Sequence, residues 1–218
     1  MKKVLAVNAS PRKNWNTALV LEKALEGAVE AGAETKLVHL HGLKFSGCVS
    51  CFSCKRIEKT ADICVVKDDL RPLLEECARA DVLIVGVPIY FSNLNAYAVA
   101  FLERLLFAGY TYNMETPSKF PKQIASALIC TMNATEEQMR QHNYPALMDH
   151  YTMTMKTVSE IMTSNSWKDA GVAKSVNNVR RCQSYLGFSQ NWITEYVYNI
   201  VMLAKKEPQQ TDDDLSLK

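Results

Sequence analysis

Short apolar runs alternate with longer amphipathic segments along the first two thirds of the chain. The apolar runs have the length and branched residues of buried strands, which we expect at Lys2–Val7, Glu34–Leu40, Val82–Val87 and Gln123–Thr131. The amphipathic segments indicate helices, expected at Thr17–Ala31, from Asp68 to about Ala80, and at Asn93–Phe107. This alternation predicts an α/β fold, a doubly wound parallel sheet with helices on both faces.

The pattern weakens after residue 132. Asn133 and Glu136 have the spacing of a capping box, which predicts a helix start, and further helical patterns run from about Tyr144 and over Asn191–Lys205. A weaker strand near Val158–Thr163 would complete a five-stranded sheet. We expect residues 1–206 to form a single domain, with the polar residues 207–218 as a disordered tail.

Composition excludes several classes of protein. Of the 218 residues, 48% are hydrophobic and 22% charged, which is typical of a globular domain. A net charge of +2 creates no strong field for nucleic acid or an anionic membrane, so we expect neither as a partner. The first apolar run ends at Asn8, too short for a signal peptide, so we expect a cytoplasmic protein whose seven cysteines form no disulfide framework.

The loop after the first expected strand has the chemistry of a phosphate site. A helix N-terminus offers backbone N–H groups and a partial positive charge, to which polar side chains add donors. The candidate phosphate ligands are Ser10, Arg12, Asn16 and Thr17. The loop contains no glycine and matches neither the Walker loop nor the dinucleotide fingerprint. An ordinary turn, with Asn16 or Thr17 as a helix cap, would use the same residues.

Two further loops follow the third and fourth expected strands. In a doubly wound sheet the carboxyl ends of the strands meet at one edge, where ligands bind. An aromatic loop and a polar loop at this edge suit a planar ring, although a strand end and a helix cap explain them separately. The candidate ring contacts are Pro88, Ile89, Tyr90, Phe91, Ser92, Asn93, Thr131, Met132 and Asn133.

A cysteine-rich loop lies between about residues 42 and 66. Cys48, Cys51 and Cys54 are each separated by two residues, and Cys64 follows after a gap of nine. Such spacing suits a [4Fe–4S] cluster, while zinc or free thiols are the alternatives. The long gap contains Lys55, Arg56 and Lys59, which would offset the charge of a thiolate-bound cluster or form a solvated face. We expect the cysteines without this spacing to be buried apolar residues: Cys77, Cys130 and Cys182.

Several of these segments resemble one family. Residues 8–17 read NASPRKNWNT and resemble the GSPRKNGNT signature of the flavodoxin-like NAD(P)H-dependent FMN reductases. Residues 87–92 resemble the SPIYFG loop of that family, residues 101–104 its AFIDR helix, and residues 129–133 its third flavin loop. The cysteine loop resembles that of the iron-sulfur flavoprotein branch. The chain departs from the pattern at Trp15 and Ser92, where the family usually has glycine, and in its longer third cysteine gap.

The resemblance implies a flavodoxin-like fold that binds FMN through the residues named above, with Cys48, Cys51, Cys54 and Cys64 as cluster ligands. It implies an enzyme that takes electrons from NAD(P)H and passes them to a flavin, a quinone, an iron-sulfur cluster or another acceptor. The absence of an obvious acid/base pair agrees with chemistry carried by a flavin. The alternatives are a flavodoxin-type electron carrier without its own NAD(P)H step and a zinc-binding module without redox function. The aromatic run Phe107–Tyr112 and the family indicate a homodimer or homotetramer.

Overall fold

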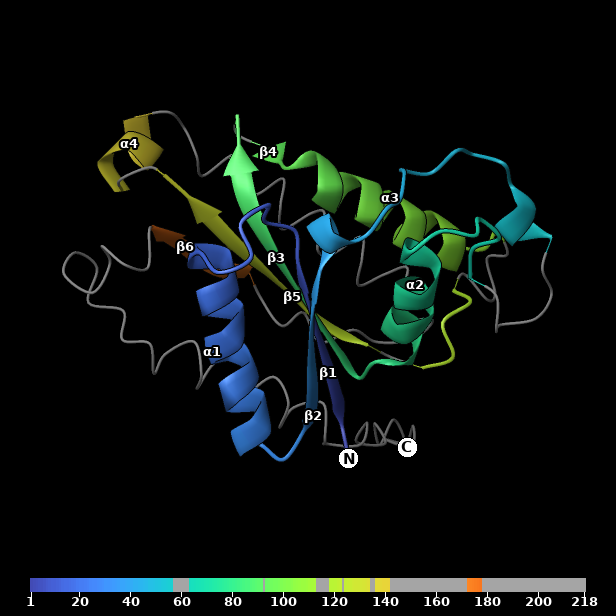
Figure 1. Ribbon diagram of the computed structural model, residues 1–218, viewed down its shortest axis with the longest axis horizontal. Helices are drawn as coiled ribbons and strands as arrows, with labels where there is room; N and C mark the ends of the chain where they lie inside the picture. The colour runs from blue at the N-terminus through green and yellow to red at the C-terminus, as the bar shows by residue number, and fades with distance from the viewer. Residues whose placement is uncertain are drawn as a thin grey trace, which may run out of the picture.

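A parallel sheet forms the centre of the molecule (Figure 1). The computed structural model describes residues 1–56, 63–91, 93–112, 118–122, 124–133, 136–141 and 172–177. The parallel strands are β1 (Lys3–Asn8), β2 (Glu34–His39), β3 (Val82–Tyr90), β5 (Ala125–Met132) and β6 (Val172–Asn177). Their order is β2-β1-β3-β5-β6, so the direction of winding reverses between β1 and β3. This confirms the predicted doubly wound sheet of five parallel strands.

Helices cover both faces of the sheet. Helix α1 (Asn16–Glu30) lies on one face, and α2 (Leu70–Arg79) and α3 (Ala96–Gly109) lie on the other (Figure 1). Successive residues of a strand point to opposite faces. Accordingly, Val4 and Ala6 belong to the core cluster under α1, whereas Leu5 and Val7 belong to the cluster under α2 and α3. Both faces are apolar, which explains the continuous hydrophobic runs in the sequence.

The predicted helix at Asn93–Phe107 begins later than expected. Strand β4 (Asn93–Leu94) turns back and pairs antiparallel with Ile89 and Tyr90. The helix starts only at Ala96, because the Asn95 side chain accepts a hydrogen bond from the backbone N–H of Ala98 and caps it. The helix was predicted to begin at Asn93, which was wrong: strand β4 occupies Asn93–Leu94, and the helix begins at Ala96.

The fifth strand is at Val172–Asn177, where we predicted none. It contains Lys174 and Ser175 between apolar residues and pairs with β5 at the edge of the described sheet. Helix α4 (Glu136–Gln141) begins at the glutamate of the predicted capping box, and the two residues between it and Asn133 lie outside the described ranges, so the cap at Asn133 stays a prediction. The expected strand at Val158–Thr163, the helices from Tyr144 and at Asn191–Lys205, and the tail lie outside the described residues. The single domain over residues 1–206 stays a prediction.

None of the helices in the described ranges is long and apolar enough to cross a bilayer.

Candidate functional site

The loop between β1 and α1 is held by its own polar groups. The Asn8 Oδ1 accepts a hydrogen bond from the backbone N–H of Ser10 at 2.8 Å, and the Ser10 Oγ accepts one from the N–H of Arg12 at 3.2 Å. Asn16 and Thr17 are the first two residues of α1, and Trp15 holds the cap position without a side-chain cap bond. The alternative in which Asn16 or Thr17 caps the helix is therefore wrong. The positive end of α1 faces the loop uncapped by a side chain.

Arg12 lies against Trp15 on the outside of this loop. Its Cζ is 4.5 Å from the centroid of the Trp15 ring, and the ring is half exposed. A guanidinium over an indole face makes a favourable cation–π contact. Trp15, which replaces the glycine of the family signature, thus holds Arg12 beside the N-terminus of the helix.

Hydrogen bonds tie the three predicted loops to one edge of the sheet. The hydroxyls of Thr17 and Thr131 are 2.7 Å apart in a buried contact that joins α1 to the end of β5. The N–H of Ala9 donates to the carbonyl of Gly86 at 2.9 Å and so joins β1 to β3. The Asn95 Nδ2 donates to the carbonyl of Ala9 at 2.6 Å. Asn95 was not among the predicted site residues, because its partner Ala9 lies 86 residues away in the sequence.

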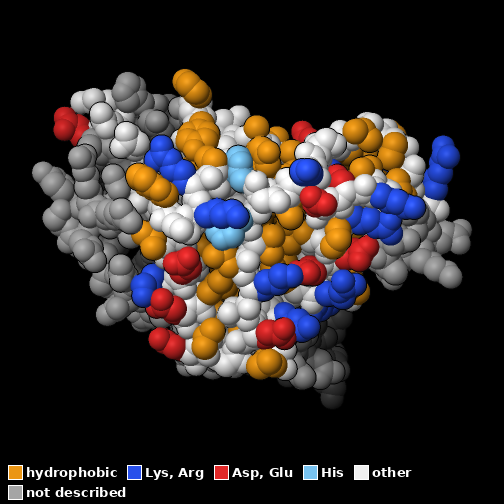
Figure 2. Space-filling model, in the orientation of Figure 1, with side chains coloured by type: hydrophobic (Ala, Val, Ile, Leu, Met, Phe, Trp, Pro, Cys, Tyr) orange, Lys and Arg blue, Asp and Glu red, His pale blue; other side chains and the backbone are white. Residues whose placement is uncertain are grey.

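The aromatic loop divides into a buried and an exposed part. Pro88 and Ile89 lie buried inside β3, whereas Tyr90 is half exposed and Phe91 is fully exposed with a φ of 48°. A positive φ is unusual for a bulky residue and marks a sharp turn at this rim. Ser92 lies outside the described residues. In Figure 2 hydrophobic side chains gather along the upper edge of the visible face, the side on which β3 and β5 end in Figure 1.

The remaining ring candidates show the same division. Thr131 and Met132 are buried at the end of β5, and Asn133 is exposed just beyond it. Asn93 is exposed, and its Oδ1 accepts a hydrogen bond from the backbone N–H of Leu94 at 2.8 Å. The exposed groups at this edge are therefore aromatic rings and amides, which suit a planar polar ring.

Two histidines lie behind these loops. His39 ends β2, and its Nδ1 is 3.0 Å from the Asn8 Nδ2. The His41 ring stacks on Tyr97 with a centroid distance of 3.8 Å. Burial lowers the pKa of both imidazoles, and for His39 the nearby Lys13 lowers the pKa further. Neutral imidazoles here support the loops by stacking and hydrogen bonding.

The four predicted cluster ligands line one cavity. Cys48, Cys51, Cys54 and Cys64 surround it together with Arg104 and Phe107, and its volume is about 20 Å³, room for one water. Cys48 and Cys51 are exposed and Cys54 is buried. Among the described residues, no three histidine, cysteine or acidic side chains converge on a finished metal site. The cavity lining nevertheless has the donors that a [4Fe–4S] cluster would need, four cysteines with a cation beside them.

The backbone of the cysteine loop is unusual. Ser50 and Phe52 have φ angles of 51° and 57° in the left-handed region, at a cost of about 1 kcal/mol or more each. The Ser50 N–H donates to the Cys48 Sγ at 3.4 Å. Hydrogen bonds from Ser53 lower the pKa of the exposed Cys51 thiol. The bonds at Cys51 favour its thiolate form, which metal binding requires.

Lysines fix the loop to the rest of the chain. The Lys55 Nζ donates to the carbonyls of Phe107 and Tyr110 and lies 4.1 Å from the Phe107 ring centroid. The Lys119 Nζ donates to the carbonyl of Cys54. Burial raises the pKa of the Cys54 thiol and lowers that of the Lys55 ammonium. Lys55 therefore does not lie on a solvated face, because carbonyls and rings surround its ammonium. Arg56 is exposed, and Lys59 lies outside the described residues.

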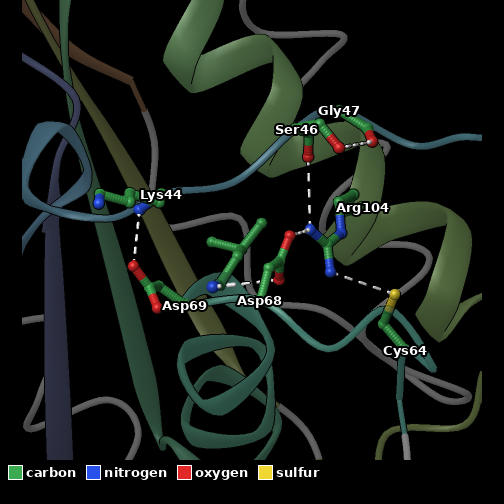
Figure 3. A network of polar contacts seen from close by, with 8 residues as sticks. Lys44, Ser46, Gly47, Cys64, Asp68, Asp69 and Arg104 are labelled. Carbon is green, nitrogen blue, oxygen red and sulfur yellow. Dashed lines mark hydrogen bonds and ion pairs between the residues drawn. The ribbon is translucent and has the colours of Figure 1, made fainter.

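Arg104 reaches the same cavity from α3. It forms an ion pair with Asp68, and its Nη1 and Nη2 donate to the Ser46 carbonyl and the Cys64 Sγ, each at 3.3 Å (Figure 3). Burial alone would lower the pKa of Arg104, but the bonds to Asp68 and Cys64 outweigh burial and raise it. Sequence reasoning noticed Arg104 only as part of the family helix and assigned it no role.

The other described cysteines are buried as predicted. Cys77 and Cys130 lie in the core cluster under α2 and α3. Burial raises the pKa of the Cys130 thiol to about 12 and also raises the pKa of Cys77. Cys182 lies outside the described residues.

The aromatic run after α3 packs mainly within its own chain. Phe107 and Tyr110 lie over Lys55, and the Tyr110 ring contacts that of Tyr112 at 5.4 Å. Only Tyr112 is largely exposed. Tyr112 is therefore the ring of this run that is available to a second subunit.

Comparisons with known proteins agree with the resemblance. The family profile described as NADPH-dependent FMN reductase matches residues 2–167, and a profile described as a domain of unknown function matches residues 131–212. An iron-sulfur flavoprotein of Methanocaldococcus jannaschii is 32% identical over 102 residues, which are 47% of this chain and 51% of that protein. An iron-sulfur flavoprotein of Methanosarcina thermophila is 33% identical over 102 residues, which are again 47% of this chain and 51% of that protein. The chain spans about half the length of the curated relatives it matches.

Solved structures share the fold. An NAD(P)H:quinone oxidoreductase from Methanothermobacter marburgensis has a TM-score of 0.62 at 16% identity, covering 94% of this chain and 96% of that one. A flavodoxin from the domain Archaea has a TM-score of 0.51 at 11% identity, covering 94% and 99%. Since the family profile spans about three quarters of the sequence and the fold agrees, the chain belongs to the NADPH-dependent FMN reductase family.

Proposed function

We propose that this protein is an FMN-dependent oxidoreductase that takes electrons from NAD(P)H. The observation that carries the proposal is the convergence of three loops at the β1/β3 reversal, joined by the Thr17–Thr131 and Asn95–Ala9 bonds. When bound, FMN supplies an acceptor for the hydride of the nicotinamide and a donor to the final acceptor. The residues of the chain bind FMN, orient its ring and supply positive charge for its phosphate.

The phosphate of FMN is assigned to the loop before α1. Ser10 and Thr17 offer hydroxyls, Asn16 an amide, and Arg12 a charge-assisted fork at the positive end of the helix. The ring is assigned to the exposed rim formed by Tyr90, Phe91, Asn93 and Asn133, above buried Pro88, Ile89, Thr131 and Met132. Ser92, which lies outside the described residues, is assigned to the same site from the sequence. Exposed aromatics beside buried strand ends agree with this placement.

We further propose a [4Fe–4S] cluster on Cys48, Cys51, Cys54 and Cys64 as an acceptor. The support is one shared cavity, an N–H bond to the Cys48 sulfur, and cations that offset the charge of four thiolates. Zinc on the same thiolates is the second candidate and would indicate a module without redox function. A flavodoxin-type carrier is the third, and the near-neutral charge of +2 disfavours it because such carriers are acidic.

Replacing Arg12 tests the flavin site. The Arg12→Ala variant loses a hydrogen bond to a charged group, so we expect FMN affinity to fall by about 1.5–3 kcal/mol. Fluorescence titration of the metal-free protein measures this loss. Lys13→Ala is the matched control, since Lys13 is an exposed cation of the same loop that is not assigned to the phosphate, and its effect should be smaller. Equal affinity of Arg12→Ala and parent would remove Arg12 from the site.

Mixing with NADH or NADPH under anaerobic conditions distinguishes an enzyme from a carrier. Rapid bleaching of flavin absorbance by either nucleotide supports the enzyme, and no bleaching over minutes supports the carrier. We also propose a homodimer or homotetramer, which static light scattering at micromolar concentration tests directly; a monomeric mass would contradict it.

A further inference from the structure

Arg104 has the largest of the fully buried side chains in the described ranges, with only 2% of the residue exposed. Arginine is almost never buried unless it is paired. Here the pair is Asp68, which precedes α2 and is partly buried. An ion pair alone, however, uses only part of a guanidinium that carries five donors.

The rest of the guanidinium faces the cysteine loop. Nη2 donates to the Cys64 sulfur, and Nη1 also donates to the Ser46 carbonyl, two residues before Cys48 (Figure 3). The Nε is buried and has no hydrogen-bond partner among the described residues. Arg104 also lines the cavity that the four cysteines share. One side chain thus contacts both ends of the loop and retains a donor.

The start of the loop packs closely on the same helix. A Cβ added at Gly47 would lie 2.9 Å from the Glu103 Oε2 and 3.7 Å from the Ala100 Cβ. The chain therefore passes close to α3 on its way to Cys48. The contact and the Arg104 bonds together place the entry and the exit of the loop relative to α3.

We propose that Arg104 is a positioning residue for the iron-sulfur cluster, which holds the Cys64 sulfur and raises the reduction potential of the cluster. The inference rests on the proposed cluster and deepens it. A thiolate-bound cluster becomes more negative when it gains an electron. A buried cation that donates to a ligand sulfur favours that reduced state, because the local dielectric is low.

A purely structural role predicts a different result. If Arg104 served only to neutralise Asp68, Arg104→Gln and Asp68→Asn would both destabilise the protein and affect the cluster alike. If its charge acts on the cluster, the two changes have opposite effects on the potential. Arg104→Gln removes a positive charge and lowers the potential. Asp68→Asn removes a negative charge, leaves Arg104 free to interact with Cys64, and raises the potential.

The experiment is an anaerobic reconstitution of the full chain with iron and sulfide, followed by a dithionite titration monitored by electron paramagnetic resonance. The variants are Arg104→Gln, Arg104→Lys and Asp68→Asn, and the exposed Arg79→Gln is the matched control. Iron and acid-labile sulfide per chain are measured first. For Arg104→Gln we expect the reduced-to-oxidised ratio at a fixed potential to fall at least tenfold, a shift of about 59 mV for one electron. Arg104→Lys keeps the positive charge, so its reduced-to-oxidised ratio should lie between those of Arg104→Gln and the parent.

The outcomes separate the inference from the proposed function. No iron uptake by the parent would overturn both the cluster and the role of Arg104. Four irons in the parent with the same potential in all variants, or shifts of one sign in Arg104→Gln and Asp68→Asn, would overturn only the role of Arg104. If Arg104→Gln does not fold, an unchanged potential in the folded Asp68→Asn protein would also overturn it. Opposite shifts, with Arg79→Gln at the parent value, support it.

Discussion

Two asparagines near the end of β3 show how position decides the role of a side chain. Asn93 is exposed and bonds only to the next backbone N–H in the described structure, whereas Asn95 is 5% exposed. The Asn95 Oδ1 caps α3, and its Nδ2 binds the carbonyl of Ala9 at the start of the phosphate loop. A single amide therefore couples the helix that carries Arg104 to the proposed flavin site.

Removing this amide should cost stability. Asn95→Ala loses a helix cap and leaves the buried carbonyl of Ala9 without this donor, so we expect a loss of about 2 kcal/mol in the free energy of unfolding. Urea denaturation measures it. Asn93→Ala is the control and should change stability by less than about 0.5 kcal/mol. Equal losses in both variants would show that the buried contact adds nothing.

At the scale of elements, α1 lies close against β3. Gly86 faces Thr17 and Leu21 on the helix, and the hydroxyl of Thr17 in turn bonds Thr131 on β5. Small residues in this strand allow the helix to approach the sheet and bring its N-terminus to the strand ends. The helix position thus controls the geometry of the phosphate loop.

A methyl group at Gly86 tests this packing. In Gly86→Ala the new Cβ would lie 2.5 Å from the Leu21 Cδ1 and 2.9 Å from the Thr17 Cγ2, so α1 or its side chains must move. Overpacking of this kind costs about 1–3 kcal/mol. Thermal unfolding measures the loss, and FMN affinity should fall with it. Gly42→Ala is the control, because no atom lies within 4 Å of the added Cβ, and a comparable loss there would refute the packing argument.

At the scale of the whole molecule, Asp81 ties strands together at the edge of the sheet opposite the proposed flavin site. Its Oδ2 accepts a hydrogen bond from the N–H of Lys3 at 2.7 Å, and its Oδ1 pairs with Lys2 and Lys122 at 3.4 and 3.1 Å. Partial burial raises the pKa of the carboxyl, but the Lys3 N–H and Lys122 lower it more, and the net pKa is lowered. The segments before β1, β3 and β5 thus share one carboxylate.

The lowered pKa of Asp81 predicts a pH dependence of stability. An aspartate with a depressed pKa in the folded state stabilises the protein above its unfolded value near 3.9, and this stabilisation is lost as the pH falls through the folded pKa. Asp81→Asn should therefore cost about 1–2 kcal/mol at pH 7. The difference from the parent should shrink below about pH 4. Denaturation at several pH values measures it, and a constant difference would show that the charge is irrelevant.

The sequence by itself determined the first four strands, the parallel sheet, the family and the loops that meet at one edge. These properties follow from local patterns, since the two-residue period of buried strands and the order of elements specify the fold class. The burial of Cys77 and Cys130 was predictable for the same reason. The strand at Val172–Asn177 was missed, because adjacent Lys174 and Ser175 leave it with neither a continuous apolar run nor a two-residue alternation.

Only the tertiary structure decided which polar groups act together. Arg104 meets Cys64, Lys55 meets Phe107, and Asn95 meets Ala9, contacts that join residues 40, 52 and 86 positions apart. No local pattern specifies such pairs, because a buried donor bonds whichever acceptor the packing of helices and strands brings within about 3 Å. The chemistry of each residue is local, but its partner is a property of the folded chain.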